Sequence, residues 1–242
     1  MKVSGGKTLY GASVGILMLE SRFPRIPGDT GNAQTWPFPV LYKVVRGASP
    51  DKVVRKGAEG LLPAFIDAAR DLVRDGADGI TTTCGFLTLM QDELQAAVPV
   101  PVATSSLMQI PLVERLLPKG KRVGVLTISA ATLTPAHFKA VGVNSDVPVV
   151  GTDEAGTEFT RVILGDEMDY DLDAARRDLL AAGDALVARH PDTGAIVLEC
   201  TNMVPFAADL SAHLGVPIYS IWTFVTWFQS GLRPPRFPGT GG

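Results

Sequence analysis

The feature that constrains the fold most is an internal repeat built around the only two cysteines of the chain. Cys84 and Cys200 lie 116 positions apart, and each follows a short run of apolar or β-branched residues and precedes a helix-like segment. The same offset brings residues 100–102 onto residues 216–218, and both segments read Val-Pro followed by an aliphatic residue. A chain of 242 residues that repeats itself in this way is predicted to be a duplicated fold with paired active residues.

Short apolar runs alternate with amphipathic segments along the whole chain, which predicts an α/β protein with parallel sheets. The expected division is a first lobe over residues 1–104 and a second over 105–220, each with about four strands. We expect strands at 14–19, 40–45, 80–83, 100–103, 122–127, 147–150, 195–199 and 216–219. We expect helices at 56–75, 86–97, 105–117, 135–141, 171–189, 204–214 and 221–232.

Each cysteine lies between the end of a predicted strand and the start of a predicted helix. In parallel sheets, ligands bind at this carboxyl end of the strands. The N–H groups of a helix N-terminus favour negative charge, so they are expected to lower a thiol pKa and to hold a carboxylate. Gly85 allows close approach, and the neighbouring side-chain donors are Thr82, Thr83, Thr201 and Asn202. One thiol could then remove a proton from a carbon while the other delivers one. The alternative is that both cysteines are buried small hydrophobes.

A long loop over residues 21–39 contains four prolines and two glycines and is not expected to be regular structure. Because it leaves the carboxyl end of the first strand, we predict that it folds over the cleft as a lid. Asn32, and with weaker support Asp29, is expected to reach the substrate. The alternative is a surface excursion or an oligomer contact.

Composition excludes several classes of function. The net charge of −3 gives no electrostatic footprint for nucleic acid, and no run is long enough to span a membrane. Two cysteines do not form a secreted disulfide scaffold, and the apolar run at residues 9–19 lacks a cleavage site, so a cytoplasmic location is expected. The three histidines show no zinc-ligand spacing, and no dinucleotide or phosphate-loop motif is present. We therefore expect no metal. A small carboxylate is the expected ligand because N–H groups at a helix start can hold one, and a homo-oligomer is also expected.

Three segments resemble the aspartate/glutamate racemase superfamily, which includes amino-acid and hydantoin racemases, maleate isomerases and arylmalonate decarboxylases. Residues 199–202 are similar to its Gly-Cys-Thr segment, Cys84 occupies the matching strand end, and residues 123–127 are followed by Thr132. The resemblance implies two flavodoxin-like lobes related by pseudo-twofold symmetry, with residues 221–242 packed on the first lobe. It also implies a substrate carboxylate between the lobes, no cofactor, and binding positions that extend to Phe86, Thr127, Ser129 and Thr132.

The sequence departs from the family at two places. Cys84-Gly85-Phe86 stands where Cys-Asn-Thr is common, and Glu20-Ser21-Arg22 replaces the Asp-Ser-Gly turn of glutamate racemases. Glu199, beside Cys200, either assists the thiol or points away. The leading hypothesis is a cofactor-independent racemase or isomerase of a small carboxylate, with the two thiols as acid and base. The alternatives are a cysteine-dependent decarboxylase, a cis–trans isomerase of a dicarboxylate, and a non-catalytic carboxylate-binding protein.

Overall fold

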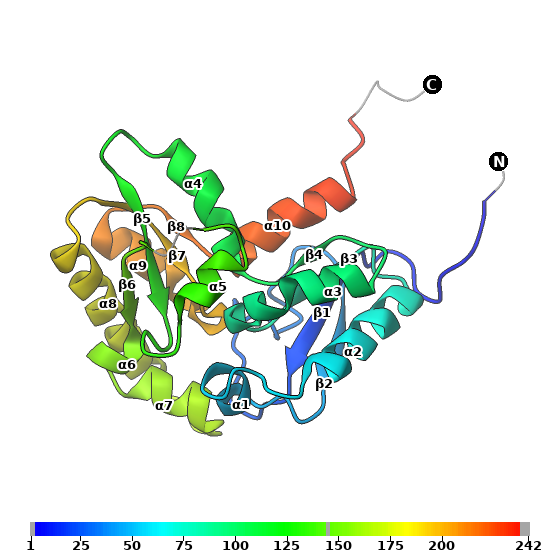
Figure 1. The fold of residues 1–242 in the computed structure, drawn as a ribbon, viewed down its shortest axis with the longest axis horizontal. Helices are drawn as coiled ribbons and strands as arrows, with labels where there is room; N and C mark the ends of the chain where they lie inside the picture. The colour runs from blue at the N-terminus through cyan, green and yellow to red at the C-terminus, as the bar shows by residue number, and fades with distance from the viewer. Residues whose placement is uncertain (1–2, 144–145, 238–242) are drawn as a thin grey trace.

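The computed structural model describes residues 3–143 and 146–237 and consists of two lobes, each with a four-stranded parallel sheet (Figure 1). The first sheet has the order β2-β1-β3-β4, with strands Val14–Leu19 (β1), Val40–Val45 (β2), Gly79–Thr82 (β3) and Val102–Ala103 (β4). The second has the order β6-β5-β7-β8, with strands Arg122–Thr127 (β5), Val149–Gly151 (β6), Thr193–Leu198 (β7) and Ile218–Tyr219 (β8). The same order in both sheets confirms the predicted duplicated α/β fold.

Helices connect the strands and cover the sheets. In the first lobe they are Pro50–Val54 (α1), Leu62–Asp75 (α2) and Gln91–Ala97 (α3). In the second they are Ile110–Leu116 (α4), Pro135–Lys139 (α5), Thr152–Ala155 (α6), Glu158–Gly165 (α7), Leu172–Arg189 (α8) and Ala207–Leu214 (α9), and Ile221–Leu232 (α10) ends the fold. Three short 3₁₀ helices are Gly85–Met90 (η1), Ser106–Gln109 (η2) and Thr201–Phe206 (η3).

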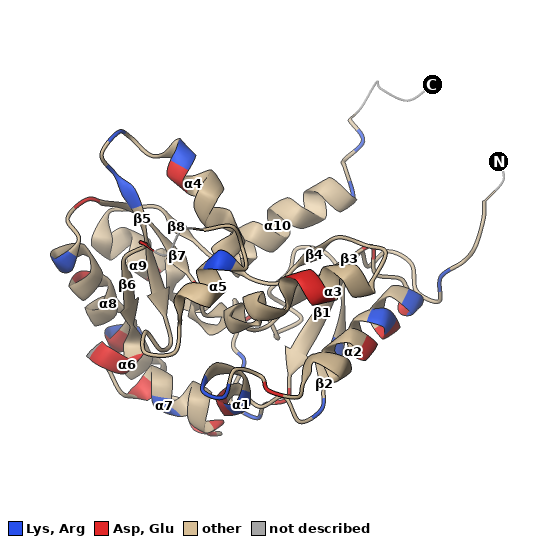
Figure 2. Cartoon of the chain, viewed as in Figure 1, with Lys and Arg blue, Asp and Glu red and all other residues tan. Residues whose placement is uncertain are grey.

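The central strands of both sheets are buried because helices cover them, as parallel sheets require. Ile16 and Leu17 of β1 and Ile196 and Val197 of β7 have no exposed surface. Charged residues gather on outer helices such as α2 and α8, while α10 carries none (Figure 2). Among the described residues, no helix is long and apolar enough to cross a membrane.

Helix α10 follows the second sheet in the chain but packs against the first. Its Ile221 and Phe224 form a cluster with Val14 and Ile16 of β1. Phe228 lies directly over Gly79 of β3, where a Cβ atom would come within 2.6 Å of its ring. Residues 238–242 of the predicted C-terminal segment lie outside the described residues.

The helices differ from the prediction at two places. The helix expected over residues 56–75 begins only at Leu62, since Gly57, Ala58 and Gly60 adopt positive φ angles that a right-handed helix does not allow. No element was predicted between the strand at 147–150 and the helix at 171–189, where the structure forms α6 and α7. Helix α7 matters for the site because its Ile163 and Leu164 form part of the pocket wall.

Candidate active site

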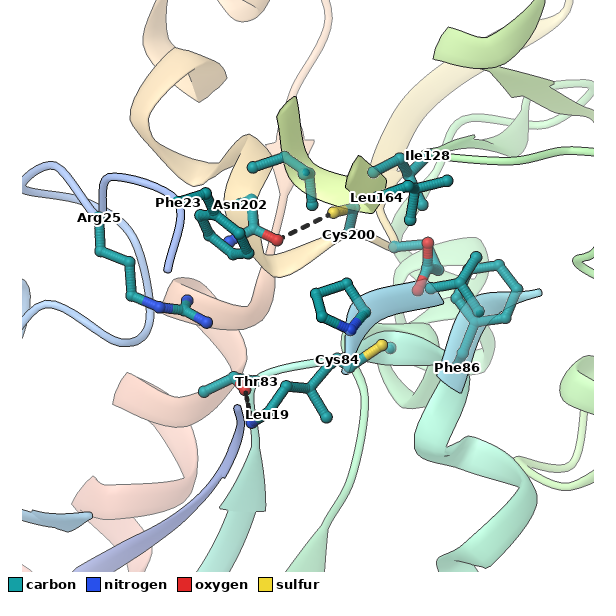
Figure 3. Close-up of a pocket in the computed structure, with 15 residues that line it drawn as sticks. Leu19, Phe23, Arg25, Thr83, Cys84, Phe86, Ile128, Leu164, Cys200 and Asn202 are labelled. Atoms are coloured by element: carbon teal, nitrogen blue, oxygen red, sulfur yellow. Dashed lines mark hydrogen bonds between the residues drawn. The ribbon is translucent and has the colours of Figure 1, made fainter. Parts of the chain in front are cut away.

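The two cysteines meet in one pocket between the lobes. Cys84 follows β3 and Cys200 follows β7, so each is the residue that precedes a 3₁₀ helix at the carboxyl end of an inner strand. Both are free and buried, and they lie on opposite sides of the pocket (Figure 3). The lining residues are Leu19, Phe23, Arg25, Pro50, Val54, Thr83, Cys84, Gly85, Phe86, Ile128, Ile163, Leu164, Glu199, Cys200 and Asn202. The repeat therefore brings equivalent thiols together, as the sequence predicted.

The free space inside the pocket is very small. Its free volume is about 20 Å³, which is room for roughly one water molecule. Its wall combines Pro50 and Val54 of α1 with Ile163 and Leu164 of α7, one helix from each lobe. A substrate of several non-hydrogen atoms can enter only when these walls separate.

The surroundings of Cys84 contain the groups that stabilise a thiolate. The backbone N–H groups of Phe86 and Leu87 and the positive charge of Arg25 all favour the ionised form of the sulfur. Burial has the larger effect, however, and together with the nearby carboxyl of Glu199 it raises the pKa of the Cys84 thiol far above its usual range. The expectation that the helix start would leave this thiol with a lowered pKa was therefore wrong.

Cys200 is hydrogen-bonded as a proton donor. Its thiol donates to Oδ1 of Asn202 at 3.5 Å, and Nδ2 of Asn202 donates to Oδ2 of Asp29 at 2.5 Å. A carboxylate only accepts hydrogen bonds, so Asp29 fixes the Asn202 amide with its oxygen towards the sulfur. Arg25 holds Asp29 in turn through a buried ion pair of 2.7 Å.

These contacts make the two thiols chemically different. Burial raises the pKa of the Cys200 thiol and the charges of Glu199 and Asp29 raise it further, while the backbone N–H of Asn202 acts in the opposite direction. Arg25, in contrast, acts on Cys84 in the direction that favours its thiolate. The geometry therefore suits Cys84 to accept a proton and Cys200 to hold one.

Asp29→Asn is expected to change the reactivity of the Cys200 thiol, while turnover stays within about tenfold of the wild type. An amide at position 29 no longer fixes the orientation of the Asn202 amide, so Oδ1 of Asn202 is no longer held at the Cys200 thiol. The measurement is steady-state kinetics together with the rate of Cys200 alkylation by iodoacetamide, which should change in the variant.

Asp166→Asn is the matched control for this prediction. Asp166 also anchors the loop, because its carboxylate accepts hydrogen bonds from the backbone N–H groups of Arg22 and Phe23. It makes no contact with Asn202 among those described, so its loss should alter loop docking and leave Cys200 alkylation unchanged. Equal effects of the two variants would mean that Asp29 only anchors the loop.

The structure places the predicted binding residues in two groups. Thr83, Gly85, Phe86 and Asn202 line the pocket with the cysteines. The others are not lining residues, and their hydroxyl groups are hydrogen-bonded within the protein. Thr82 donates to Thr104 O at 2.7 Å, Thr201 to Thr83 O at 2.8 Å, Thr127 to Glu199 Oε2 at 2.7 Å, Ser129 to Asp153 Oδ2 at 2.8 Å, and Thr132 to Ser129 O at 3.5 Å.

Asn32 is not brought to the pocket. Its Nδ2 donates to Arg25 O at 2.8 Å and its Oδ1 accepts from the N–H of Gln34 at 2.9 Å, so it shapes the loop itself. The loop nevertheless reaches the second lobe, where Gly28 packs against Pro205 of η3. Its contribution to the pocket comes from Phe23 and Arg25, and Asp29 reaches the site through Asn202.

The sequence reasoning did not identify Arg25 as a site residue and left the role of Glu199 open. Arg25 points into the pocket from the loop (Figure 3). Glu199 is completely buried and also lines the pocket. The sequence signal for Glu199 as a site residue was its position as a charged residue directly before the strand-end cysteine Cys200. Within the described residues, no group of three metal-ligating side chains forms a cluster that could hold a metal ion.

Comparison with known proteins agrees with the geometry. Residues 108–227 match the family model described as Asp/Glu/Hydantoin racemase. The predicted resemblance to the aspartate/glutamate racemase superfamily is confirmed. The match runs from the end of η2 into α10 and contains Cys200, whereas Cys84 and its divergent neighbours lie outside it.

Solved structures from this superfamily have the same fold. An arylmalonate decarboxylase superposes with a TM-score of 0.59 at 17% identity, over 95% of this chain and 97% of that one. An aspartate racemase from Picrophilus torridus gives 0.58 at 13% identity, over 91% and 94% of the two chains. Decarboxylases and racemases thus share this architecture, so the fold alone does not select the reaction.

The similar proteins of known activity include two lyases. This chain is 28% identical over 236 residues to a dimethylsulfoniopropionate lyase of Durusdinium sp. clade D, covering 93% of this chain and 77% of the relative. It is 27% identical over 245 residues to dimethylsulfoniopropionate lyase 7 of Emiliania huxleyi (strain CCMP1516), covering 93% and 69%. These relatives extend the comparison from racemases and decarboxylases to lyases.

Proposed function

We propose that this chain is a cysteine-dependent lyase that removes the proton next to a carboxylate and expels a leaving group from the neighbouring carbon. Dimethylsulfoniopropionate is the candidate substrate. The observation that carries the proposal is the similarity to two dimethylsulfoniopropionate lyases over 93% of the chain, a span that extends over both lobes. The racemase hypothesis from the sequence shares the first step, proton removal from the α-carbon.

The electrostatics of the pocket suit a cationic substrate. Burial raises the pKa of both thiols, so neither ionises readily before a substrate binds. A sulfonium charge beside Cys84 favours the thiolate, since an opposite charge lowers a thiol pKa. The rings of Phe23 and Phe86 in the wall are suited to a cation, and the Arg25 guanidinium already lies 4.5 Å from the Phe23 ring centroid.

The reaction needs one base and no added cofactor. The Cys84 thiolate takes the proton from the carbon next to the carboxylate, and that electron pair forms the carbon–carbon double bond. The bond from the β-carbon to sulfur breaks, and its electrons leave with the sulfur as neutral dimethyl sulfide. Acrylate remains, and the Cys84 thiol returns its proton to solvent.

A second candidate is racemisation or isomerisation, favoured by the presence of two thiols in one pocket. In that reaction, the Cys200 thiol delivers a proton to the face opposite Cys84. Elimination gives Cys200 no such task, because dimethyl sulfide leaves as a neutral molecule. The requirement for Cys200 therefore separates the two candidates.

The purified chain is expected to convert dimethylsulfoniopropionate into equal amounts of dimethyl sulfide and acrylate, measured by gas chromatography and proton NMR. Aspartate, glutamate, hydantoins and arylmalonates incubated in deuterated water are the comparison set. Deuterium exchange or decarboxylation in that set, with no acrylate formed, would replace the lyase by the racemase or decarboxylase. Turnover of none of these compounds would favour a carboxylate-binding protein.

A further inference from the structure

Glu199 is a buried carboxyl group that the elimination mechanism leaves without a task. It is the last residue before Cys200, and its side chain has no exposed surface. Its backbone N–H is held by Leu126 O at 2.8 Å, which fixes it to β5. The side chain lies against Gly85, where a Cβ atom would come within 2.3 Å of its Oε1. The carboxyl group therefore sits next to Cys84, in the space that a side chain at position 85 would occupy.

The two carboxyl oxygens have different surroundings. Oε2 accepts a hydrogen bond from the Thr127 hydroxyl at 2.7 Å. That hydroxyl in turn accepts from the N–H of Ser129 at 3.4 Å, so its own hydrogen is free to point at Glu199. Oε1 is buried and has no hydrogen-bond partner among the described residues. A buried polar atom without a partner is costly, which points to a partner that arrives with the ligand.

The proton of a neutral Glu199 belongs on Oε1. Burial raises the pKa of this carboxyl to about 7, although the Thr127 hydroxyl and the backbone N–H of Ile128 act in the opposite direction. Because Oε2 already accepts the Thr127 hydrogen, Oε2 is the carbonyl oxygen of the neutral carboxyl group, and the proton is on Oε1. Within the described part of the chain, that O–H meets no acceptor.

We propose that neutral Glu199 binds the substrate carboxylate, donating a hydrogen bond from Oε1 to a carboxylate oxygen beside Gly85. A donor at this place opposes the negative charge that builds up on the carboxylate when Cys84 removes the α-proton. The neutral form also spares both thiols the charge that an ionised Glu199 places beside them. The inference rests on the proposed function only in that the substrate carries a carboxylate.

The other titratable groups around the pocket include Tyr170 near Cys200, whose pKa burial raises far above its usual range. Cys84 and Cys200 stay protonated before a substrate binds, and Arg25 and Asp29 form an ion pair at the loop. On the far side, the ring of His137 of α5 lies 5.0 Å from that of Phe86, and burial lowers the pKa of this histidine. Between about pH 6 and pH 8, Glu199 is therefore the pocket group expected to change charge most.

Propionate, which keeps the carboxylate and lacks the sulfonium group, is the probe. In the wild-type chain its affinity, measured by NMR titration, is expected to fall about tenfold between pH 6 and pH 8 as Glu199 ionises. Glu199→Gln keeps a neutral donor and the Thr127 contact, so it should bind propionate equally at both pH values. Glu199→Ala removes the donor and should weaken binding at pH 6 by about 10- to 100-fold.

Three results overturn the proposal: no propionate binding to the wild type at pH 6, equal binding in Glu199→Ala, or a Glu199→Gln variant as dependent on pH as the wild type. Thermal unfolding shows whether each variant is folded, and a purely structural role would leave the pH dependence of binding unchanged. Because propionate is not cleaved, its dissociation constants are independent of lyase activity. Failure to cleave dimethylsulfoniopropionate would remove the proposed reaction and leave the binding result intact.

Discussion

Cys84→Ala is expected to reduce the release of dimethyl sulfide by about 10²- to 10⁴-fold, the usual effect of losing a general base. Cys200→Ala is expected to stay within about tenfold of the wild type. The difference follows from the contacts: Cys84 faces the N–H groups and the arginine that stabilise a thiolate, while the Cys200 thiol is committed to Asn202. The measurement is kcat/KM for both variants, with thermal unfolding to establish that each is folded.

The pair of variants also discriminates between the reactions open to this fold. Loss of activity in both variants would indicate proton transfer at two faces, as in a racemase or isomerase. A dispensable Cys200 agrees with elimination and also with decarboxylation, and the products separate those two. If neither variant loses activity, thiol chemistry is wrong for this site. Cys200→Ser is a milder companion variant, because its hydroxyl can still donate to Oδ1 of Asn202.

The strands were the part of the fold that the sequence specified best. The bounds expected for β1, β2 and β5 are those found. For β1 and β5 the reason is that an inner parallel strand buried on both faces is a nearly continuous apolar run with sharp ends. Helix α7 was missed although Phe159, Val162 and Ile163 follow helical spacing. It is only eight residues long, too short for its apolar spacing to stand out in a single sequence.

The position of the cysteines was predictable, whereas their ionisation was not. A strand-end cysteine in each repeat places both at the same edge of the fold, and the structure has them in one pocket. The pKa of a thiol depends on how completely the second lobe excludes water, and that follows from long-range packing of α1 against α7. A single sequence contains no local signal for such packing.

The loop illustrates the same limit. Its proline and glycine content identified residues 21–39 as an excursion from the first strand, and it does contact the second lobe. Which polar side chain turns inwards depends on backbone turns that composition does not specify. The turns place Asp29 at Asn202 and leave Asn32 bonded within the loop.

Gly85→Ala is expected to lower kcat/KM by about 10²-fold, the effect of displacing reacting groups by about 1 Å. A Cβ atom at this position would lie 2.4 Å from the main-chain oxygen of Glu199 and 2.3 Å from its Oε1. The side-chain oxygen can move, but the main-chain oxygen belongs to the second lobe and moves only with it. The added methyl group therefore pushes apart the segments that carry Cys84 and Cys200, and such overpacking costs about 1–3 kcal/mol of stability.

Gly231→Ala in α10 is the matched control, because a Cβ atom there meets nothing within 4 Å. In a helix, alanine is more stable than glycine by about 0.5–1 kcal/mol, so this variant should unfold at the same or a higher temperature with unchanged kinetics. The comparison separates contact between the lobes from any general effect of exchanging glycine for alanine. Wild-type kinetics in Gly85→Ala would mean that catalysis does not depend on this close contact between the lobes. The contact with Glu199 would then not explain the glycine at position 85.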